Sequence, residues 1–203
     1  MICAIVLAAG QSRRMGVQKL LLPLGSKTVI AHVVDEVLRS TLGAVYVVVG
    51  CEATRITEAL TGRRVTFVTN PDTEGDMLSS VRCGLQALPP QCKAAMVVLG
   101  DQPAITSALI DAMVRAFAET DKGILAPLYG GKRGHPILFS VRYRDEILER
   151  YDAVGLRGLL HAHSDDLLEL RVANPGVLSD MDRPEDYQRE RLLFDENTRK
   201  KRN

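Results

Sequence analysis

The chain has 203 residues, of which 46% are hydrophobic and 25% charged, and its formal net charge is +1. This length suits one globular domain with a sizeable core, and the balanced charge excludes a global field for nucleic acid or an anionic membrane. No apolar run approaches the ~18 residues that span a bilayer, and the N-terminus lacks the positive segment of a signal peptide. Four cysteines without CxxC spacing favour free thiols, with Cys3 buried, and a cytoplasmic protein.

Along the chain, short apolar runs alternate with segments of helical periodicity. The runs expected to form strands are 2–7, 44–49, 65–69, 94–99, 123–127, 135–139 and 166–172. The segments expected to form helices are 27–40, 53–61, 77–88, 106–120, 141–150, 155–163 and 184–193. This alternation predicts an α/β fold: a single domain with three α/β/α layers, Rossmann-like, around a mostly parallel sheet.

The sequence contains no internal repeat and no linker that would separate two domains. Residues 1–193 are therefore expected to form one domain, and the polar segment 194–203 a disordered tail. In open parallel sheets, ligands bind at the carboxyl ends of the strands. Three loops should meet at that edge: the loop after the first strand, residues 70–80, and GDQP at 100–103.

The loop after the first strand differs from both common phosphate-binding loops. Counting from Gly10, Met15 stands where a Walker A motif needs its second glycine, and Ser12 breaks the GxGxxG pattern of dinucleotide-binding folds. Its small residues let backbone N–H groups approach a ligand closely, and its cations suit a polyphosphate. These residues are Ala8, Ala9, Gly10, Arg14 and Lys19. The alternative is a surface loop whose charges are solvated.

Two acidic positions later in the chain suit a metal site. Asp101 directly follows the strand expected at 94–99, and Asp182 lies just before Pro184, which begins a helix. Two carboxylates from distant loops make a site of hard oxygen ligands for Mg²⁺, which also binds substrate phosphates. Asp180 is the rival of Asp182 for the second position, and a helix or turn cap is the alternative role for Asp101.

Four motifs, in the same order, resemble those of the MobA-like nucleotidyltransferases, and most closely the MocA group of molybdenum cofactor cytidylyltransferases. They are LAAGQSRRMGVQKLLLP at 7–23, GDQP at 100–103, RGHPILF at 133–139 and DMDRPEDY at 180–187. The resemblance covers most of the chain. It implies nucleotidyl transfer, in which an acceptor phosphate attacks the α-phosphate of a nucleoside triphosphate and pyrophosphate leaves.

The same resemblance implies roles for individual residues. Arg14, Lys19 and Asp101 would be catalytic, and Asp101 and Asp182 would hold Mg²⁺ on the nucleotide phosphates. The nucleotide would be bound by Leu7, Ala8, Ala9, Gly10, Arg14, Lys19, Asn70, Gly75, Ser79, Ser80 and Asp101. The acceptor would be bound by Arg133, His135 and Arg157.

The segment 70–80 departs from the family pattern, because one residue, such as Asp76, is extra between Gly75 and the serines. Ser79 and Ser80 are equally suited to begin a helix. Helix capping therefore remains the alternative to nucleotide binding for each serine.

The first loop reads LAAG where guanylyl-transferring relatives tend to read LAGG, and GDQP also favours the cytidylyl branch. The resemblance thus favours CTP and the molybdenum cofactor as substrates, with molybdopterin cytosine dinucleotide as product. A molybdoenzyme or its maturation chaperone would be a further partner. The alternatives are transfer from GTP, transfer to another phosphorylated acceptor, and a non-catalytic carrier of the molybdenum cofactor. A flavin or nicotinamide enzyme is disfavoured by the missing GxGxxG pattern.

Overall fold

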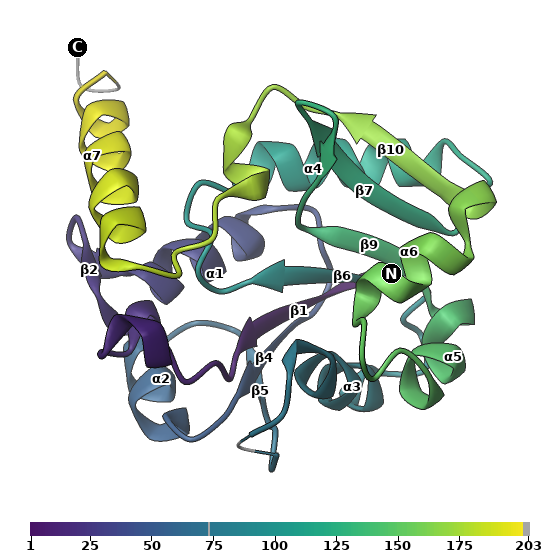
Figure 1. Ribbon diagram of the computed structural model, residues 1–203, viewed down its shortest axis with the longest axis horizontal. Helices are drawn as coiled ribbons and strands as arrows, with labels where there is room; N and C mark the ends of the chain where they lie inside the picture. Colours follow the sequence, from purple (N-terminus) through teal and green to yellow (C-terminus); the bar gives the residue numbers. More distant parts are fainter. Residues whose placement is uncertain (73, 201–203) are drawn as a thin grey trace.

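The computed structural model of the chain describes residues 1–72 and 74–200 (Figure 1). Within them, an 8-stranded sheet has the order β10-β7-β9-β6-β1-β4-β5, with β8 paired to β7. Its strands are β1 Ile2–Ala8, β4 Val45–Val49, β5 Thr66–Thr69, β6 Ala94–Leu99, β7 Ile124–Tyr129, β8 Lys132–Arg133, β9 Ile137–Ser140 and β10 Leu167–Arg171. Neighbours from β6 to β5 are parallel, whereas β9 runs antiparallel to β6 and β7. The predicted fold, with a mostly parallel sheet, is confirmed.

The helices fall close to the expected segments. The α-helices are α1 Val29–Arg39, α2 Ala53–Ala59, α3 Met77–Ala87, α4 Ser107–Ala118, α5 Arg144–Glu149, α6 Leu156–Ala162 and α7 Pro184–Lys200. Short 3-10 helices are η1 Arg13–Met15, η2 Lys19–Leu21, η3 Val141–Tyr143, η4 Ser164–Asp166 and η5 Pro175–Leu178. None of the helices in the described part of the chain is long and apolar enough to cross a membrane.

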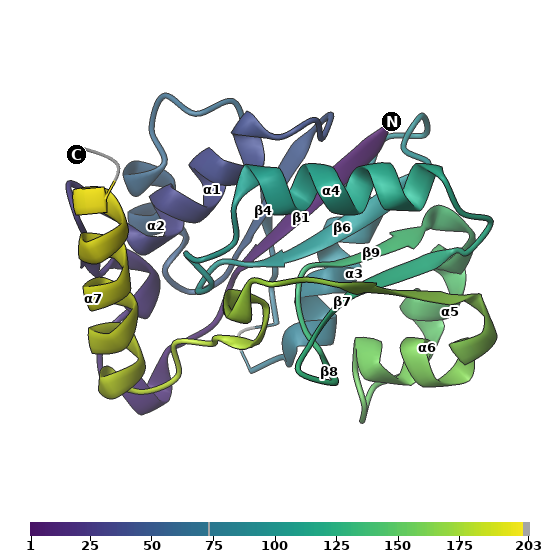
Figure 2. The same cartoon turned by 90° about the horizontal axis from the view of Figure 1, so that it is seen from above.

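Helices cover both faces of the sheet and make the three layers (Figures 1 and 2). On β1, Ala4 and Val6 face the layer of α1, α2 and α4, whereas Cys3 and Ile5 face the layer of α3, α5 and α6. All four side chains are fully buried, which explains why β1 is a continuous apolar run rather than an alternating one. Cys3 is a buried free thiol, as expected.

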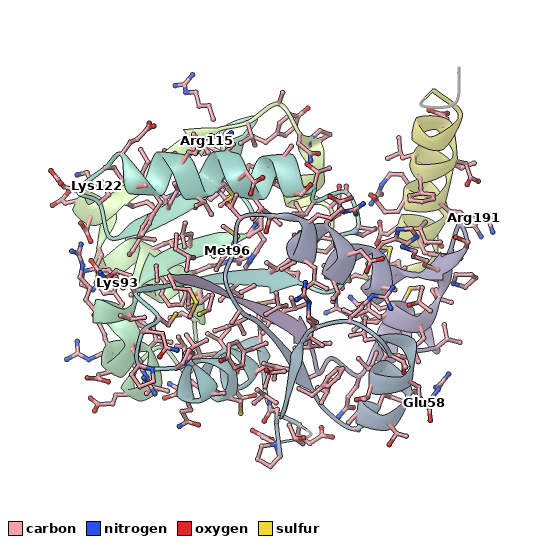
Figure 3. All side chains as sticks on the ribbon, turned by 180° about the vertical axis from the view of Figure 1, so that it is seen from behind. Glu58, Lys93, Met96, Arg115, Lys122 and Arg191 are labelled. Atoms are coloured by element: carbon pink, nitrogen blue, oxygen red, sulfur yellow. The ribbon has the colours of Figure 1, made fainter. Side chains whose placement is uncertain are left out.

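Charged side chains lie on the outside of these layers, away from the sheet. Figure 3 shows Arg115 and Lys122 projecting outward, while Met96 on β6 is enclosed in the core. The chain has 26 Lys and Arg against 25 Asp and Glu residues, so its charges nearly cancel. A binding site for an anion must therefore be built locally.

Two local features differ from the expected pattern. Residues 23–28 form a small antiparallel hairpin, β2 Pro23–Leu24 and β3 Lys27–Thr28, which is too short to give a periodic signal. The start of α3 is capped by neither serine: the side chain of Asp76 accepts the Ser79 N–H at 3.0 Å. Asp76, suggested as the extra residue relative to the family pattern, is therefore the N-cap of the helix.

The helix expected at 184–193 continues to Lys200. Tertiary contact explains the difference. The Phe194 ring meets the His32 ring edge-on with centroids 4.7 Å apart, and it packs on a small cluster built around Leu24, Val29 and Met181. The apolar anchor Phe194, directly after the expected end, holds a segment that is otherwise polar. The rest of the predicted tail, 201–203, lies outside the described residues.

Candidate active site

A cleft of about 480 Å³ opens where β1 and β6 end. It is lined by the loop after β1, by residues of the 70–80 segment, by Leu99 and Asp101, and by Asp180 and Asp182. The three loops that the sequence places at the carboxyl edge of the sheet therefore meet, as expected for a parallel α/β fold. A fourth segment, 180–182, joins them from the far end of the chain.

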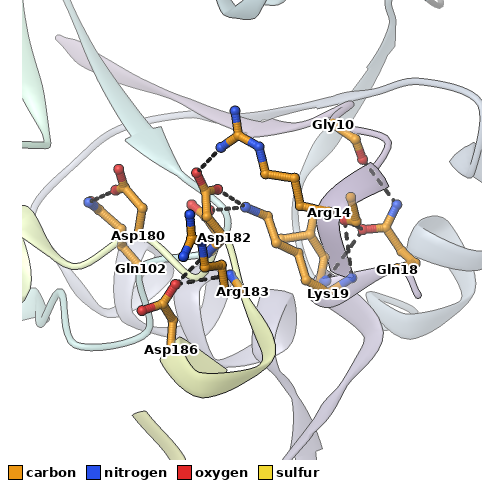
Figure 4. A network of polar contacts seen from close by, with 12 residues as sticks. Gly10, Arg14, Gln18, Lys19, Gln102, Asp180, Asp182, Arg183 and Asp186 are labelled. Atoms are coloured by element: carbon orange, nitrogen blue, oxygen red, sulfur yellow. Dashed lines mark hydrogen bonds and ion pairs between the residues drawn. The ribbon is translucent and has the colours of Figure 1, made fainter. Parts of the chain in front are cut away.

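The loop after β1, residues 9–19, which we call the first loop, is held in shape by its own side chains. Ser12 has a left-handed backbone with φ of 52°, and its hydroxyl donates to the Gln18 side-chain oxygen at 2.9 Å. The same hydroxyl accepts the Lys19 N–H at 3.2 Å, and the Gln18 amide donates to the Gly10 carbonyl at 3.1 Å (Figure 4). The role of Gln18 in closing this loop was missed, because nothing in the sequence pairs it with Ser12.

The first loop also depends on close contacts with the neighbouring strands. A Cβ at Gly50, directly after β4, would lie 2.7 Å from the Ala9 carbonyl oxygen. A Cβ at Gly100 would lie 2.6 Å from the Leu7 carbonyl oxygen, which accepts the Gly100 N–H at 3.0 Å. Glycine is thus required on both sides of the end of β1. Leu7, Ala9 and Gly10 line the cleft, whereas Ala8 is buried at the end of β1.

The cationic and acidic side chains predicted for the site form one network. The Lys19 ammonium lies 2.5 Å from Asp101 Oδ2 and 3.1 Å from Asp182 Oδ1, and the Arg14 guanidinium lies 2.8 Å from Asp182 Oδ2. The Lys19 and Asp101 side chains are only 14% and 13% exposed, whereas Arg14 is 76% exposed. Burial alone would lower the pKa of Lys19, but the negative charge of Asp101 and hydrogen bonds to both carboxylates raise it. Lys19 is therefore a firmly charged ammonium.

Asp180 points to a different partner from Asp182. Its carboxylate accepts a hydrogen bond of 2.7 Å from the side-chain amide of Gln102, which is buried (Figure 4). Burial raises the pKa of Asp180, and the negative charges of Asp101 and Asp182 add to this effect, against the hydrogen bond from Gln102. Asp182, not Asp180, therefore shares the Lys19 ammonium with Asp101. Asp180 still contributes a third carboxylate to the cleft.

In the 70–80 segment, Asn70 organises the loop. It is 3% exposed, and its amide donates to the hydroxyls of Ser79 and Ser80 at 2.8 and 3.0 Å. Its carbonyl oxygen accepts the Asp72 N–H at 3.0 Å. Asn70, Gly75 and Ser80 line the cleft, whereas Ser79 supports the loop from behind, donating to the Asp76 carbonyl at 2.8 Å. The structure thus brings the predicted residues of this segment together around Asn70.

The predicted acceptor residues lie outside the lining of this cleft. The Arg133 side chain, on β8, pairs with Glu169 of β10 at 2.6 Å. The charges of Asp101 and Arg157 both act on the pKa of His135. Burial lowers the pKa of His135 to about 4, and Arg157 adds to the effect, while Asp101 and the Val97 backbone oppose it. His135 is therefore a neutral imidazole, and the Arg157 side chain is exposed.

The fold and the site define a class of protein: an α/β protein that presents a cationic loop and paired carboxylates at the carboxyl edge of its sheet. Residues 4–167 match the MobA-like NTP transferase domain. The chain belongs to this family of nucleotidyltransferases.

The relatives agree with this assignment. The molybdenum cofactor cytidylyltransferase of Escherichia coli is 27% identical over 184 residues, which cover 90% of this chain and 92% of that protein. The structure of Rv0371c from Mycobacterium tuberculosis matches with a TM-score of 0.85 at 27% identity, covering 94% of this chain and 97% of that one. A complex of Rv0371c with manganese has a TM-score of 0.81. The nucleotidyl transferase Mth528 of Methanothermobacter matches at 0.85 and 27% identity, covering 97% and 99% of the two chains.

Proposed function

We propose that the protein transfers a cytidylyl group from CTP to the phosphate of the molybdenum cofactor and releases pyrophosphate. The main support is the arrangement of Lys19, Asp101 and Asp182, which come from three distant segments and meet at one cleft. The cleft of about 480 Å³ is within the size range of small-molecule sites. Cations beside carboxylates at this edge of the sheet suit a triphosphate and the metal ion that accompanies it.

The chemistry requires positioning and charge neutralisation rather than a covalent enzyme intermediate. Backbone N–H groups of the first loop and the exposed Arg14 would hold the β- and γ-phosphates, and Lys19 would stabilise charge around the α-phosphate. An oxygen of the acceptor phosphate forms a bond to the α-phosphorus. The bond between the α-phosphorus and the bridging oxygen breaks, and its electron pair leaves with pyrophosphate.

The donor set fits a Mg²⁺ ion. Asp101 and Asp182 offer carboxylate oxygens, the ligands that Mg²⁺ prefers. Among the described residues, no group of three or more His, Cys, Asp or Glu side chains is arranged to hold a metal ion. Nucleotide phosphates and water would then complete the ligand set, which is the usual way in which Mg²⁺ is bound. When bound, the ion supplies positive charge against the triphosphate. The manganese complex of Rv0371c supports a divalent cation in this fold.

The acceptor would approach from the side of His135 and Arg157. Arg157 is exposed, and its positive charge contributes to the lowered pKa of His135. A guanidinium can pair with the acceptor phosphate, while a neutral imidazole adds a hydrogen bond without adding charge next to Asp101. Arg133 would contribute to the acceptor only by leaving Glu169.

The choice of CTP rests on the LAAG sequence at 7–10 and on the similarity to the Escherichia coli cytidylyltransferase. Transfer from GTP, or to another phosphorylated acceptor, would use the same catalytic residues. A carrier of the molybdenum cofactor would need the cationic loop and the acceptor site, but not both carboxylates of the Lys19–Asp101–Asp182 network. That network therefore favours the enzyme over the carrier.

Pyrophosphate release from each of the four ribonucleoside triphosphates tests the proposal, with Mg²⁺ and with or without molybdenum cofactor. We expect turnover with CTP alone, dependent on the cofactor. Turnover with GTP instead would keep the chemistry and change the nucleotide. Absence of turnover with every nucleotide, together with cofactor binding, would support the carrier.

A further inference from the structure

The Lys19 ammonium stands between the two carboxylates that the proposed function assigns to the metal ion. Its Nζ contacts Asp101 Oδ2 at 2.5 Å. It also contacts Asp182 Oδ1 at 3.1 Å (Figure 4). A metal ion held by both carboxylates has to take the position of this ammonium. We propose that Lys19 and the metal ion compete for Asp101 and Asp182, so that the metal enters only together with a nucleoside triphosphate that draws Lys19 away. This inference rests on the proposed function, because it takes these carboxylates as the metal ligands.

The contacts of the network support competition. Asp101 and Asp182 are paired with Lys19 and Arg14, while Asp180, a third carboxylate of the cleft, bonds to Gln102 instead. A divalent cation added alone at Asp101 and Asp182 would lie next to the Lys19 ammonium, which is only 14% exposed, so the two positive charges would repel each other. A triphosphate brings several negative charges to the same place. The ammonium and the guanidinium can then exchange carboxylate oxygens for phosphate oxygens without losing an anionic partner.

The backbone of Lys19 is held while its side chain has room to change partner. The Lys19 N–H donates to Ser12 Oγ at 3.2 Å, and Ser12 is itself bonded to Gln18. The side chain lines the cleft beside Arg14, so its ammonium can reach a phosphate bound there without movement of the first loop. The flexible four-carbon stem of lysine permits such a swing.

Lys19 should matter more than Arg14 in keeping the metal out. The Arg14 side chain is 76% exposed and contacts only one carboxylate in the network, that of Asp182. Solvent weakens such an exposed ion pair. Lys19 is 14% exposed and touches both carboxylates.

If a triphosphate draws Lys19 away from the carboxylates, it strengthens metal binding. By thermodynamic linkage, the metal then strengthens triphosphate binding by the same factor.

The test is a titration of the protein with Mn²⁺ in the absence of nucleotide. The electron paramagnetic resonance signal of the free ion measures how much Mn²⁺ stays unbound. Lys19→Met removes the ammonium without adding a ligand atom. It should tighten Mn²⁺ binding by about 5- to 150-fold, the usual range of coupling between linked sites. Lys27→Met is the matched control, because Lys27, on the β2–β3 hairpin, pairs with Asp35 of α1 at 2.6 Å. It should bind Mn²⁺ as weakly as the wild type, and so should Lys19→Arg, which keeps the charge.

Adding Asp101→Asn to Lys19→Met should abolish the gain, which places the new affinity at this site. Equal Mn²⁺ affinity for the wild type and Lys19→Met, or a gain that survives Asp101→Asn, would overturn the inference. Melting temperatures check that each variant is folded. Calorimetric titration of the wild type with CTP, in Mn²⁺ and in EDTA, separates the competition between Lys19 and the metal from the metal role in the proposed function. Metal-dependent CTP binding without a gain in Lys19→Met refutes only the competition, whereas metal-independent CTP binding refutes the metal role in the proposed function.

Discussion

The hydroxyl of Tyr187, on α7, donates a hydrogen bond of 2.6 Å to the carbonyl oxygen of Pro23, on β2. This bond joins the helix that follows Asp182 to the hairpin that follows the first loop. The cluster around Leu24 and Met181 packs beneath it. The Asp182 side chain and the cations Arg14 and Lys19 of the first loop are therefore positioned by one small apolar contact between segments from opposite ends of the chain.

Phe194→Ala should uncouple this contact. Because the ring is partly buried against the cluster and His32, we expect the free energy of unfolding to fall by about 2 kcal/mol. Nucleotidyl transfer should fall further than stability explains, since Asp182 loses its support. The control is Leu192→Ala on the same helix: Leu192 is 61% exposed, so its loss should change stability by less than about 0.5 kcal/mol. Chemical denaturation measures the stability of each variant, and turnover measures its activity. Equal effects of Phe194→Ala and Leu192→Ala would contradict this role for α7.

The two candidate second carboxylates can be distinguished by matched substitutions. Asp182 shares Lys19 with Asp101, whereas Asp180 bonds to Gln102. We expect Asp182→Asn to lower turnover about 100-fold or more, as for loss of a group that stabilises charge in the transition state. Asp180→Asn should have a clearly smaller effect, because Asn can still accept the bond from Gln102. Steady-state pyrophosphate release decides the matter, and a larger loss in Asp180→Asn would reverse the assignment.

Gln18→Ala should loosen the first loop. The substitution removes the bonds from Gln18 to Gly10 and Ser12, so the backbone that would cradle the phosphates is no longer preorganised. We expect KM for the nucleotide to rise about tenfold, equivalent to ~1.4 kcal/mol, with a small change in melting temperature. Gln91→Ala, at the other end of β6 from the cleft, is the control and should leave KM unchanged. An unchanged KM in Gln18→Ala would show that the loop keeps its shape without this bond.

The Asp35 carboxylate predicts a pH dependence of stability. Burial alone would raise the pKa of Asp35, but hydrogen bonds from Arg63 and Lys27 hold it below its ordinary value of 3.8. The folded protein thus binds the proton less readily than the unfolded chain, and this stabilisation is complete above pH 3.8. It is lost as the pH falls through the lowered pKa. Asp35→Asn should cost about 1–2 kcal/mol at pH 7.

Urea denaturation of the wild type and Asp35→Asn between pH 7 and pH 2.5 measures this effect. The difference in unfolding free energy should stay constant down to about pH 4 and then shrink, following the sign of the linkage relation. A difference that grows on acidification would mean that the pKa of Asp35 is raised rather than lowered.

The sequence predicted the order of elements and the edge of the sheet that carries the site. β1 and β6 are uninterrupted apolar runs because both faces are covered, and such runs are visible without a structure. The first loop, Asp101 and the DMDRPEDY segment were recognised because their chemistry depends on residue type and local order. The family match over residues 4–167 includes the first loop and Asp101.

Contacts between distant residues could not be predicted in this way. No periodicity indicates that Asp182 rather than Asp180 meets Lys19, because that depends on how the segment before α7 lies across the end of β1. Likewise, the continuation of α7 to Lys200 depends on Phe194 packing near Leu24, a contact between the two ends of the chain. The sequence alone thus determined the strands, the helices and the loops with functional residues, because local patterns of burial and charge encode them. Only the tertiary structure decided which cation faces which carboxylate, since packing brings those side chains together.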